Sequence, residues 1–324
     1  MKHWLNLLTV TAVATFVYTG CGGGGDSGGT PTTSSTLTAE NADAFLERVS
    51  TTIPGCTYSG TAMASAQYSV IVPTVITNVT SSSAFKAAQN ADPAPQTIEC
   101  LNLDSIAEGN ITLTSNVDQT AISATFNQCN IGSLTQQNTT IDGLVNLGLS
   151  KDANGTLTSI TASTGSSGIT VVDTNVSQNI NLILSGFKVE VGDGTSTNPL
   201  AVTLGTLKFT DKIVAAQSFT VSNCYATEYA DMTGDIYLDL DRCSYTDVNG
   251  TFAFASEGPI VASTDGTLNG SVKVTATDDS NMVFTFTNST GIVDVTLNGN
   301  AFGTMDCTEA ATDLTDTNLS GITL

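Results

Sequence analysis

The chain of 324 residues is strongly acidic: 30 Asp and Glu, nine Lys and Arg and one His give a formal net charge of −21. A surface with this charge repels anionic polymers, so we expect no nucleic acid and no other phosphate-rich molecule among its partners. The length is sufficient for a body with a substantial hydrophobic core.

The first twenty residues have the layout of a secretory signal peptide. A short positive start is followed by an apolar run from Trp4 to Tyr18, and two small residues then precede Cys21. The run is too short for a comfortable bilayer span. We therefore predict a cleaved signal peptide over residues 1–20, with an uncleaved N-terminal anchor helix as the alternative.

The end of this apolar run resembles the lipobox of bacterial lipoproteins, with Tyr18 where Leu is usual. In that family the chain is cut before the cysteine, whose thiol then carries diacylglycerol. The resemblance implies that Cys21 is lipidated and that the membrane is a partner through the N-terminal lipid. Gly22, where inner-membrane lipoproteins of enteric bacteria have Asp, favours the outer membrane, on its periplasmic or its cell-surface face.

Residues 21–37 are almost all Gly, Ser, Thr and Pro after the cysteine. Such a composition has few side chains to bury and predicts a flexible tether, with a root-mean-square reach of about 20–25 Å. We place the folded, β-rich body at residues 38–324.

Six cysteines remain once Cys21 is lipidated, and an even number in an exported chain predicts disulfide bonds because the periplasm is oxidising. Six cysteines allow fifteen pairings, of which we favour Cys100–Cys129, Cys224–Cys243 and Cys56–Cys307. The first two close short loops and the third ties the two ends of the body. The alternative, metal binding, lacks a C-x-x-C spacing and a histidine, so we predict no metal site at these cysteines.

The segment "TAENADAFLERVS", residues 38–50, predicts the one helix of the body. Thr38 can cap it, acids lie in its first turn, and Ala44, Phe45 and Val49 recur near helical spacing. We expect this short helix to pack as a lid or plug against the strands.

After the helix the hydrophobic pattern has a period of two, as in "NITLTSN", "DIYLDLD", "SVKVTAT" and "MVFTFTN". Threonine, whose branched Cβ suits a half-exposed strand, is the commonest residue. Asn-Gly pairs at residues 154, 249, 269 and 298 predict hairpin turns. Together these features predict an all-β, antiparallel body, built as a meander, a sandwich or a barrel-like sheet.

Two short motifs recur at the same spacing. "ATFNQC" (124–129) and "FTVSNC" (219–224) are 95 residues apart, and so are "DANGT" (152–156) and "DVNGT" (247–251). This coincidence predicts two duplicated units, at about residues 120–215 and 216–310.

A wider resemblance rests on four features: the glycine-rich lipobox, "LTAENADAF", "TFNQC" and the strand "TIDGLVNLGLS". Together they resemble a set of uncharacterised proteobacterial lipoproteins. The resemblance implies an envelope location and a β-architecture with Cys-containing repeats, but no activity.

Catalytic machinery is hard to assemble from the mature chain. Removal of residues 1–20 takes away the only His (His3) and the only Trp (Trp4), and with Lys2 it changes the formal charge to −22. Without His there is no Ser-His-Asp or Cys-His system, and G-x-S-x-G, P-loop, dinucleotide and haem motifs are absent. We therefore predict no enzyme and no cofactor.

The strand "DIYLDLD" carries the remaining chemistry. Asp235, Asp239 and Asp241 are expected on one face, with Tyr237 between them, and alternate residues lie about 6.5–7 Å apart. Asp239 and Asp241 could approach the carboxylate separation used by glycosidases, or the face could bind calcium. A solvent-exposed polar face is the alternative.

Tyrosines are enriched around the same segment. They are Tyr225, Tyr229, Tyr237 and Tyr245, and with the three aspartates they form the candidate binding surface; packing in the core or in cross-strand pairs is the alternative use.

The sequence as a whole favours a lipid-anchored envelope protein that acts as a non-enzymatic structural, adhesive or binding module for an envelope protein or a glycan. A carbohydrate-active or carbohydrate-binding protein that uses these carboxylates and tyrosines is the first alternative. An assembly subunit whose exposed strands pair with a partner is the second.

Overall fold

The computed structural model describes residues 35–50 and 95–306, without residues 103, 117, 119, 132–138, 154–156, 174–177, 214–217, 266 and 289–291. The predictions for the signal peptide, for Cys21 and for the Cys56–Cys307 disulfide lie outside these residues.

Within these ranges the chain forms one helix and sixteen strands. The elements are α2 (Ala39–Ser50), β1 (Gln96–Leu101), β2 (Ala107–Ser115), β3 (Ala121–Asn130), β4 (Thr139–Lys151), β5 (Leu157–Asp173), β6 (Gln178–Ser185), β7 (Phe187–Glu190), β8 (Leu200–Asp211), β9 (Phe219–Ala230), β10 (Ile236–Asp247), β11 (Gly250–Ser256), β12 (Ile260–Ala262), β13 (Leu268–Ala276), β14 (Asn281–Asn288), β15 (Ile292–Leu297) and β16 (Asn300–Asp306).

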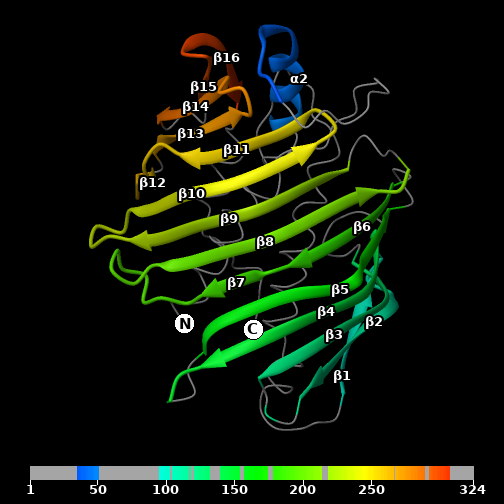
Figure 1. Cartoon of the computed structure of the whole chain (residues 1–324). Coiled ribbons are helices and arrows are strands. Elements are labelled where there is room, and N and C mark those ends of the chain that lie inside the picture. The colour runs from blue at the N-terminus through cyan, green and yellow to red at the C-terminus, as the bar shows by residue number, and fades with distance from the viewer. Residues whose placement is uncertain are drawn as a thin grey trace.

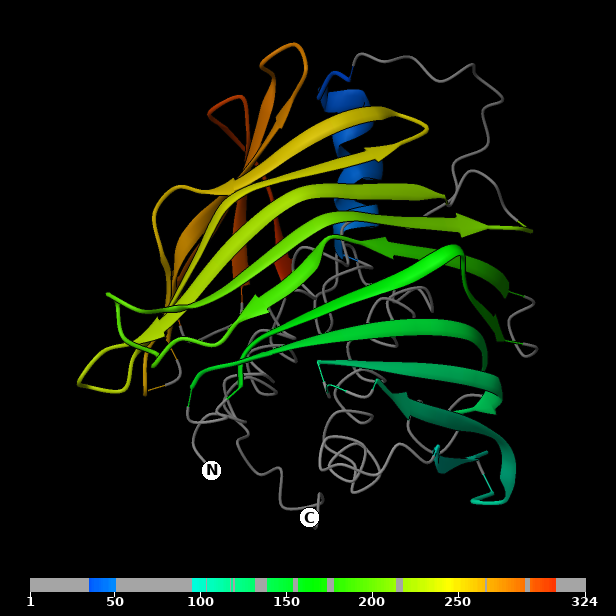
Figure 2. The same cartoon turned by 60° about the horizontal axis from the view of Figure 1, so that its bottom comes forward.

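The strands form a single antiparallel sheet in which nearly every strand pairs with its neighbours in sequence. The exceptions are the short strands β7, which lies between β5 and β8, and β12, which lies between β10 and β13. Figures 1 and 2 show that the sheet is strongly curved and that α2 lies inside the curve near β11 and the last strands. The all-β prediction is confirmed, in the form of a meander.

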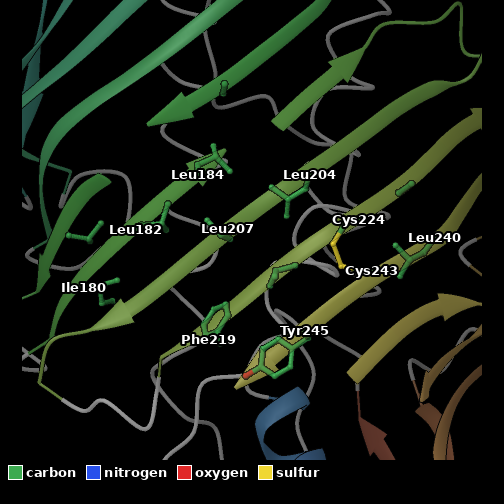
Figure 3. Packing of buried hydrophobic residues seen from close by; sticks show 14 of the residues in the cluster. Ile180, Leu182, Leu184, Leu204, Leu207, Phe219, Cys224, Leu240, Cys243 and Tyr245 are labelled. Atoms are coloured by element: carbon green, nitrogen blue, oxygen red, sulfur yellow. A yellow bond between two sulfur atoms is a disulfide. The ribbon is translucent and has the colours of Figure 1, made fainter. Parts of the chain in front are cut away.

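The inner face of the sheet holds the hydrophobic core. Figure 3 shows one part of it, where side chains from β6, β8, β9 and β10 point to the same side. In β3 the alternation is direct: Ile122, Ala124 and Phe126 are buried, and the residues between them are partly exposed. Threonine and serine therefore occupy many outer positions, as the pattern of period two predicts.

The predicted helix is confirmed, and its N-terminus is capped by backbone and side-chain bonds. Thr38 is the cap residue: its carbonyl accepts from the N–H of Ala42, and its own N–H donates to Oδ1 of Asn41 (2.8 Å). Ala42, Phe45 and Leu46 are buried, and the Phe45 ring lies 5.0 Å from that of Phe252 in β11. The helix thus covers the inner face of the sheet.

The folded body begins earlier than we predicted. Ser35 and Leu37, which we assigned to the end of the tether, are buried against the sheet. The N–H of Leu37 donates to Oγ of Ser280 (2.7 Å), and Ser35 bonds to both Thr251 and Thr277. These contacts fix the point at which the N-terminal segment meets the sheet.

Several strands contain irregular positions with a positive φ angle. Gly109 in β2, Gln128 in β3 and Asn223 in β9 have φ angles of +75°, +45° and +55°. A Cβ on Gly109 would lie 2.0 Å from the carbonyl oxygen of Gln128, so only glycine allows this approach of β2 to β3. Bulges of this kind increase the local twist and bend a strand.

Two of the three predicted disulfides are confirmed, and each has one cysteine directly after such a position. Cys100 in β1 is bonded to Cys129 in β3, and Cys224 in β9 is bonded to Cys243 in β10. All four cysteines are buried on the inner face.

The Asn-Gly pairs have different outcomes. Asn298-Gly299 forms the turn between β15 and β16 with φ angles of +49° and +78°, as predicted. Asn249 lies in the turn between β10 and β11, and Gly250 is the first residue of β11. The turn predicted at Asn269-Gly270 is wrong, because both residues lie inside β13, where a Cβ on Gly270 would be 2.8 Å from Cα of Ile260. The Asn154-Gly155 pair is outside the described part of the chain.

Candidate functional site

The candidate site lies on the outer face of the sheet, where β9 pairs with β10. In β9, Cys224, Ala226 and Glu228 are buried on the inner face, so Tyr225 and Tyr229 point outward. We call this outer area, with the turn that joins the two strands, the β9–β10 surface. Its residues are Tyr225, Tyr229, Asp231, Asp235, Tyr237, Asp239, Asp241 and Arg242.

Two tyrosines form the centre of this surface. Tyr229 and Tyr237 are direct cross-strand partners, and their rings are stacked with centroids 4.8 Å apart and an interplanar angle of 2°. Both side chains are half-exposed. A stacked aromatic pair of this kind stabilises the strand pairing and leaves the ring edges and hydroxyl groups available to a ligand.

Asp231, in the turn between the strands, is tied to this tyrosine pair. The Tyr237 hydroxyl donates to its Oδ2 (3.2 Å), while its Oδ1 accepts from the Thr233 hydroxyl (2.6 Å) and from two backbone N–H groups. The hydrogen bond from the Thr233 side chain is the main reason why the pKa of Asp231 lies below its ordinary value. Sequence analysis missed Asp231, although the D-x-T spacing is a signal for such a turn.

The same contact acts on the tyrosine in the opposite direction. The negative charge of Asp231 is the main reason why the pKa of Tyr237 is raised above its ordinary value, because it opposes a phenolate at this position. Tyr237 is therefore a neutral hydrogen-bond donor next to an ionised carboxylate.

Two of the predicted aspartates have structural partners. Oδ1 of Asp235 accepts from the backbone N–H of Thr264 (2.9 Å), which links the β9–β10 turn to the loop before β13. Oδ1 of Asp239 accepts from the Ser256 hydroxyl (2.6 Å), which also bonds to the backbone of Leu240. These bonds hold both carboxylates in place on the outer side.

The expected alternation ends at Asp241. The register of β10 against β9 shifts at Arg242, so that Asp241 and Arg242 are both exposed between the buried Leu240 and Cys243. Asp241 pairs with Arg242 (3.2 Å), whose guanidinium lies 5.9 Å from the centre of the Tyr225 ring. Asp239 and Asp241 thus have different partners, and the regular strand face on which we based a paired carboxylate site is interrupted.

Tyr245 does not belong to the binding surface, and its prediction is corrected. The bulge reverses the faces of β10, so Tyr245 points inward and is only 3% exposed. Its ring contacts Phe219 (5.6 Å), Phe252 (6.4 Å) and Phe254 (6.3 Å). Tyr245 is a core residue.

The arrangement suits binding more than acid–base chemistry. It offers ring edges, tyrosine hydroxyl oxygens, carboxylate acceptors and one guanidinium within two adjacent strands, which together match polar ligands. In the described part of the chain, no group of three or more His, Cys, Asp or Glu side chains is placed to hold a metal ion. Among the same residues, no helix is long and apolar enough to cross a membrane.

Comparison with known proteins gives no family for the chain: no protein-family model matches it, and no curated protein matches it significantly. The function must therefore be argued from the chemistry of the β9–β10 surface itself.

Proposed function

We propose that this protein is a lipid-anchored bacterial envelope protein that acts as a non-enzymatic binding module, and that it binds its partner through the β9–β10 surface. The lipobox resemblance and the Gly/Ser/Thr-rich segment after Cys21 support the anchor. The half-exposed aromatic and charged side chains of β9 and β10 support the binding role.

One observation carries the proposed binding role: the stacked pair Tyr229–Tyr237 with the Tyr237 hydroxyl bonded to Asp231. Tyrosine gives a large contact area at a low entropic cost, and here its position is fixed by a ring partner and a hydrogen bond. A fixed polar and aromatic surface loses little entropy when a partner binds.

The anchor is tested with the wild-type chain and a Cys21→Ser variant expressed in a Gram-negative host. We expect radiolabelled fatty acid on the wild type alone, and the wild type in outer-membrane fractions. The Cys21→Ser variant should remain unlabelled and leave the membrane. Equal membrane retention of the two proteins, without a label, would refute the anchor.

The binding role is tested by capture of partners from detergent-solubilised envelope with the immobilised full chain. The test variant is Tyr237→Ala combined with Asp231→Asn, which removes the ring pair and the charge. The matched control is Lys188→Ala combined with Glu190→Gln, which removes an exposed ion pair (2.6 Å) on β7. Retention by the control and loss by the test variant is the expected result; equal capture by both excludes this surface.

A carbohydrate ligand is the second candidate, favoured by Arg242 and the carboxylates beside the tyrosine hydroxyls. A glycan array probed with the same proteins decides this point. Binding that is lost in Tyr237→Ala would support it. No binding to any glycan, together with unchanged behaviour of Asp239→Asn in the capture experiment, would exclude it.

A further inference from the structure

The strands of the sheet end in turns on two opposite sides, and the N-terminal segment meets the sheet on one of these sides. Ser35 bonds to Thr277 beside the β13–β14 turn and to the carbonyl of Thr251 beside the β10–β11 turn. Its backbone packs directly on Gly250, where an added Cβ would lie 2.8–3.0 Å from Ser35 atoms. The chain that leads back to Cys21 therefore departs from this side of strand ends and turns. We call this side the N-terminal edge, and we call the side that holds the β9–β10 turn the opposite edge.

The strand registers show which turns share this edge. Phe209 pairs with Phe219, and Thr220 pairs with Thr246, so residues 212–213 after β8 and residues 248–249 after β10 project from the same side. The two turns are two strands apart, or about 10 Å.

Exposed apolar side chains occur at several turns of this edge. Six large hydrophobic side chains are exposed in the described ranges; Ile213 and Val248 lie near Ser35, and Leu101 and Ile106 lie at the β1–β2 turn, at the far end of the strand order. Ile213 is 56% exposed and follows the exposed Lys212, while Val248 is 43% exposed at the tip of the β10–β11 turn. An apolar side chain beside a lysine is a combination that suits the boundary between lipid head groups and acyl chains.

At the opposite edge, two loops contact the β9–β10 turn. There the β9–β10 turn contacts the loop before β8, where the N–H of Ala230 donates to the carbonyl of Gly194, and the loop before β13, through Asp235 and Thr264. In these same loops, hydrogen bonds from threonine side chains lower the pKa values of Asp193, Asp231 and Asp265. A hydrogen bond from the Ser280 side chain does the same for the pKa of Asp278 at the N-terminal edge, so both edges carry ionised carboxylates. The exposed apolar side chain at the opposite edge, Met232, directly follows one of these ionised carboxylates.

The short segment between Cys21 and Ser35 places the two edges at different distances from the predicted lipid anchor. Only thirteen residues, 22–34, separate Ser35 from Cys21, and the tether predicted from their Gly/Ser/Thr-rich composition would have a reach of about 20 Å. The twelve residues of β9 cover about 36–40 Å between the two edges. An anchor at Cys21 would thus keep the N-terminal edge near the bilayer and the β9–β10 turn far from it.

We infer that the N-terminal edge is the membrane-facing side of the protein, where Ile213 and Val248 contact the bilayer surface, and that the β9–β10 surface faces away from the lipid. This inference rests on the proposed lipid anchor and adds an orientation to it. Four aspartates at turns of the same edge (Asp104, Asp247, Asp278 and Asp279) repel anionic head groups, so the lipid contacted is zwitterionic rather than anionic.

Single tryptophans test the orientation, because the chain after residue 20 has none. Val248→Trp and Ile213→Trp place the reporter at the N-terminal edge, and Met232→Trp is the matched control at the opposite edge. The mature lipidated product, residues 21–324, is reconstituted into phosphatidylcholine vesicles that contain bromine-labelled phospholipid. Circular dichroism verifies that each variant is folded, and the two N-terminal-edge variants serve as independent reporters.

The expected result is a loss of emission of about twofold or more for V248W or I213W and little change for M232W, since side chains at an interface lie about 5–10 Å deep. Quenching of M232W as strong as that of the other two variants, or no quenching of any reporter, would overturn the orientation.

Failure of the anchor itself gives a different signal. If the lipidated protein does not sediment with vesicles, the proposed anchor is wrong. The orientation is then tested with residues 22–324 behind an N-terminal histidine tag on vesicles that contain nickel-chelating lipid, which supplies an attachment at the same point. The same quenching pattern supports the membrane-facing edge, and its absence overturns it.

Discussion

Two regions of the sheet, the end of β3 and the middle of β9, share a local design but serve different roles. In each, a polar residue with a positive φ (Gln128 or Asn223) directly precedes a buried cysteine. In each, the preceding strand has a glycine opposite this residue: Gly109 approaches Gln128, and Gly205 lies between the paired positions Leu204–Cys224 and Thr206–Ser222. The bulge is what turns the cysteine to the inner face.

The difference lies in the residues after the cysteine. β3 ends one residue after Cys129, whereas β9 continues to Ala230 and carries Tyr225 and Tyr229 on its outer face. The disulfides differ as well: Cys129 reaches across to β1, and Cys224 bonds within a pair of adjacent strands. A common local motif thus supports two roles, the attachment of a strand in one region and the base of the candidate surface in the other. The two duplicated units remain a prediction.

The largest expected effect is the loss of a disulfide. Removal of Cys100–Cys129 (separation 29) or of Cys224–Cys243 (separation 19) by paired Cys→Ala changes should each reduce the free energy of unfolding by about 3–4 kcal/mol. The location of the effect should differ, because β1 pairs only with β2 among the described strands, while β9 and β10 share a long ladder. Hydrogen exchange should show β1 amides exposed in the first variant and β9–β10 amides protected in the second. Equal protection of β1 in both variants would contradict this comparison.

The next effect concerns the glycines opposite the bulges. Gly109→Ala should cost about 3 kcal/mol, because the left-handed φ and the contact with the carbonyl oxygen of Gln128 both oppose a Cβ. Gly205→Ala should cost about 1 kcal/mol, because its nearest contact, at 3.0 Å, is the carbonyl oxygen of Ser185 in β6 and not an atom of Asn223. Urea denaturation of the two variants measures the difference. A smaller loss for Gly109→Ala than for Gly205→Ala would contradict the close approach of Gly109 to Gln128.

The bulge residues themselves provide a smaller effect. Gln128→Val and Asn223→Val should each cost about 1–2 kcal/mol, because a β-branched side chain resists a positive φ. Asn223→Gly should be nearly neutral, and Gln128→Asn should stabilise slightly, since Asn tolerates this conformation better than Gln. Thermal unfolding of the four variants tests the pattern, and a neutral Asn223→Val would argue against strain at this position.

The same bulges explain which features could be read from the sequence. Period-two alternation and cysteine spacing were sufficient for the strands and for two disulfides, because both depend on local order along the chain. The face of Tyr245 was not predictable by alternation, since one extra residue at Asp241–Arg242 moves all later side chains to the other side. Asn269-Gly270 resembled a turn, but its glycine serves the close approach of β12, which is a tertiary requirement. Asp231 was missed because its partner, Tyr237, lies across the turn.

The smallest expected effect on stability concerns the β9–β10 turn, which follows the part of β9 that has no counterpart in β3. Hydrogen bonds from Thr233 hold the pKa of Asp231 below its ordinary value in the folded protein. The ionised carboxylate therefore stabilises the β9–β10 turn at pH values above the ordinary pKa of an aspartate. This stabilisation is lost as the pH falls through the folded pKa. Asp231→Asn should therefore lower the urea midpoint slightly at about pH 7 and converge with the wild type at about pH 2–3. Thr233→Val, which removes the hydroxyl donor, should reduce the pH dependence of the turn without removing the charge. A constant difference between Asp231→Asn and wild type across this range would show that the turn depends on the shape of Asp231 rather than on its ionisation.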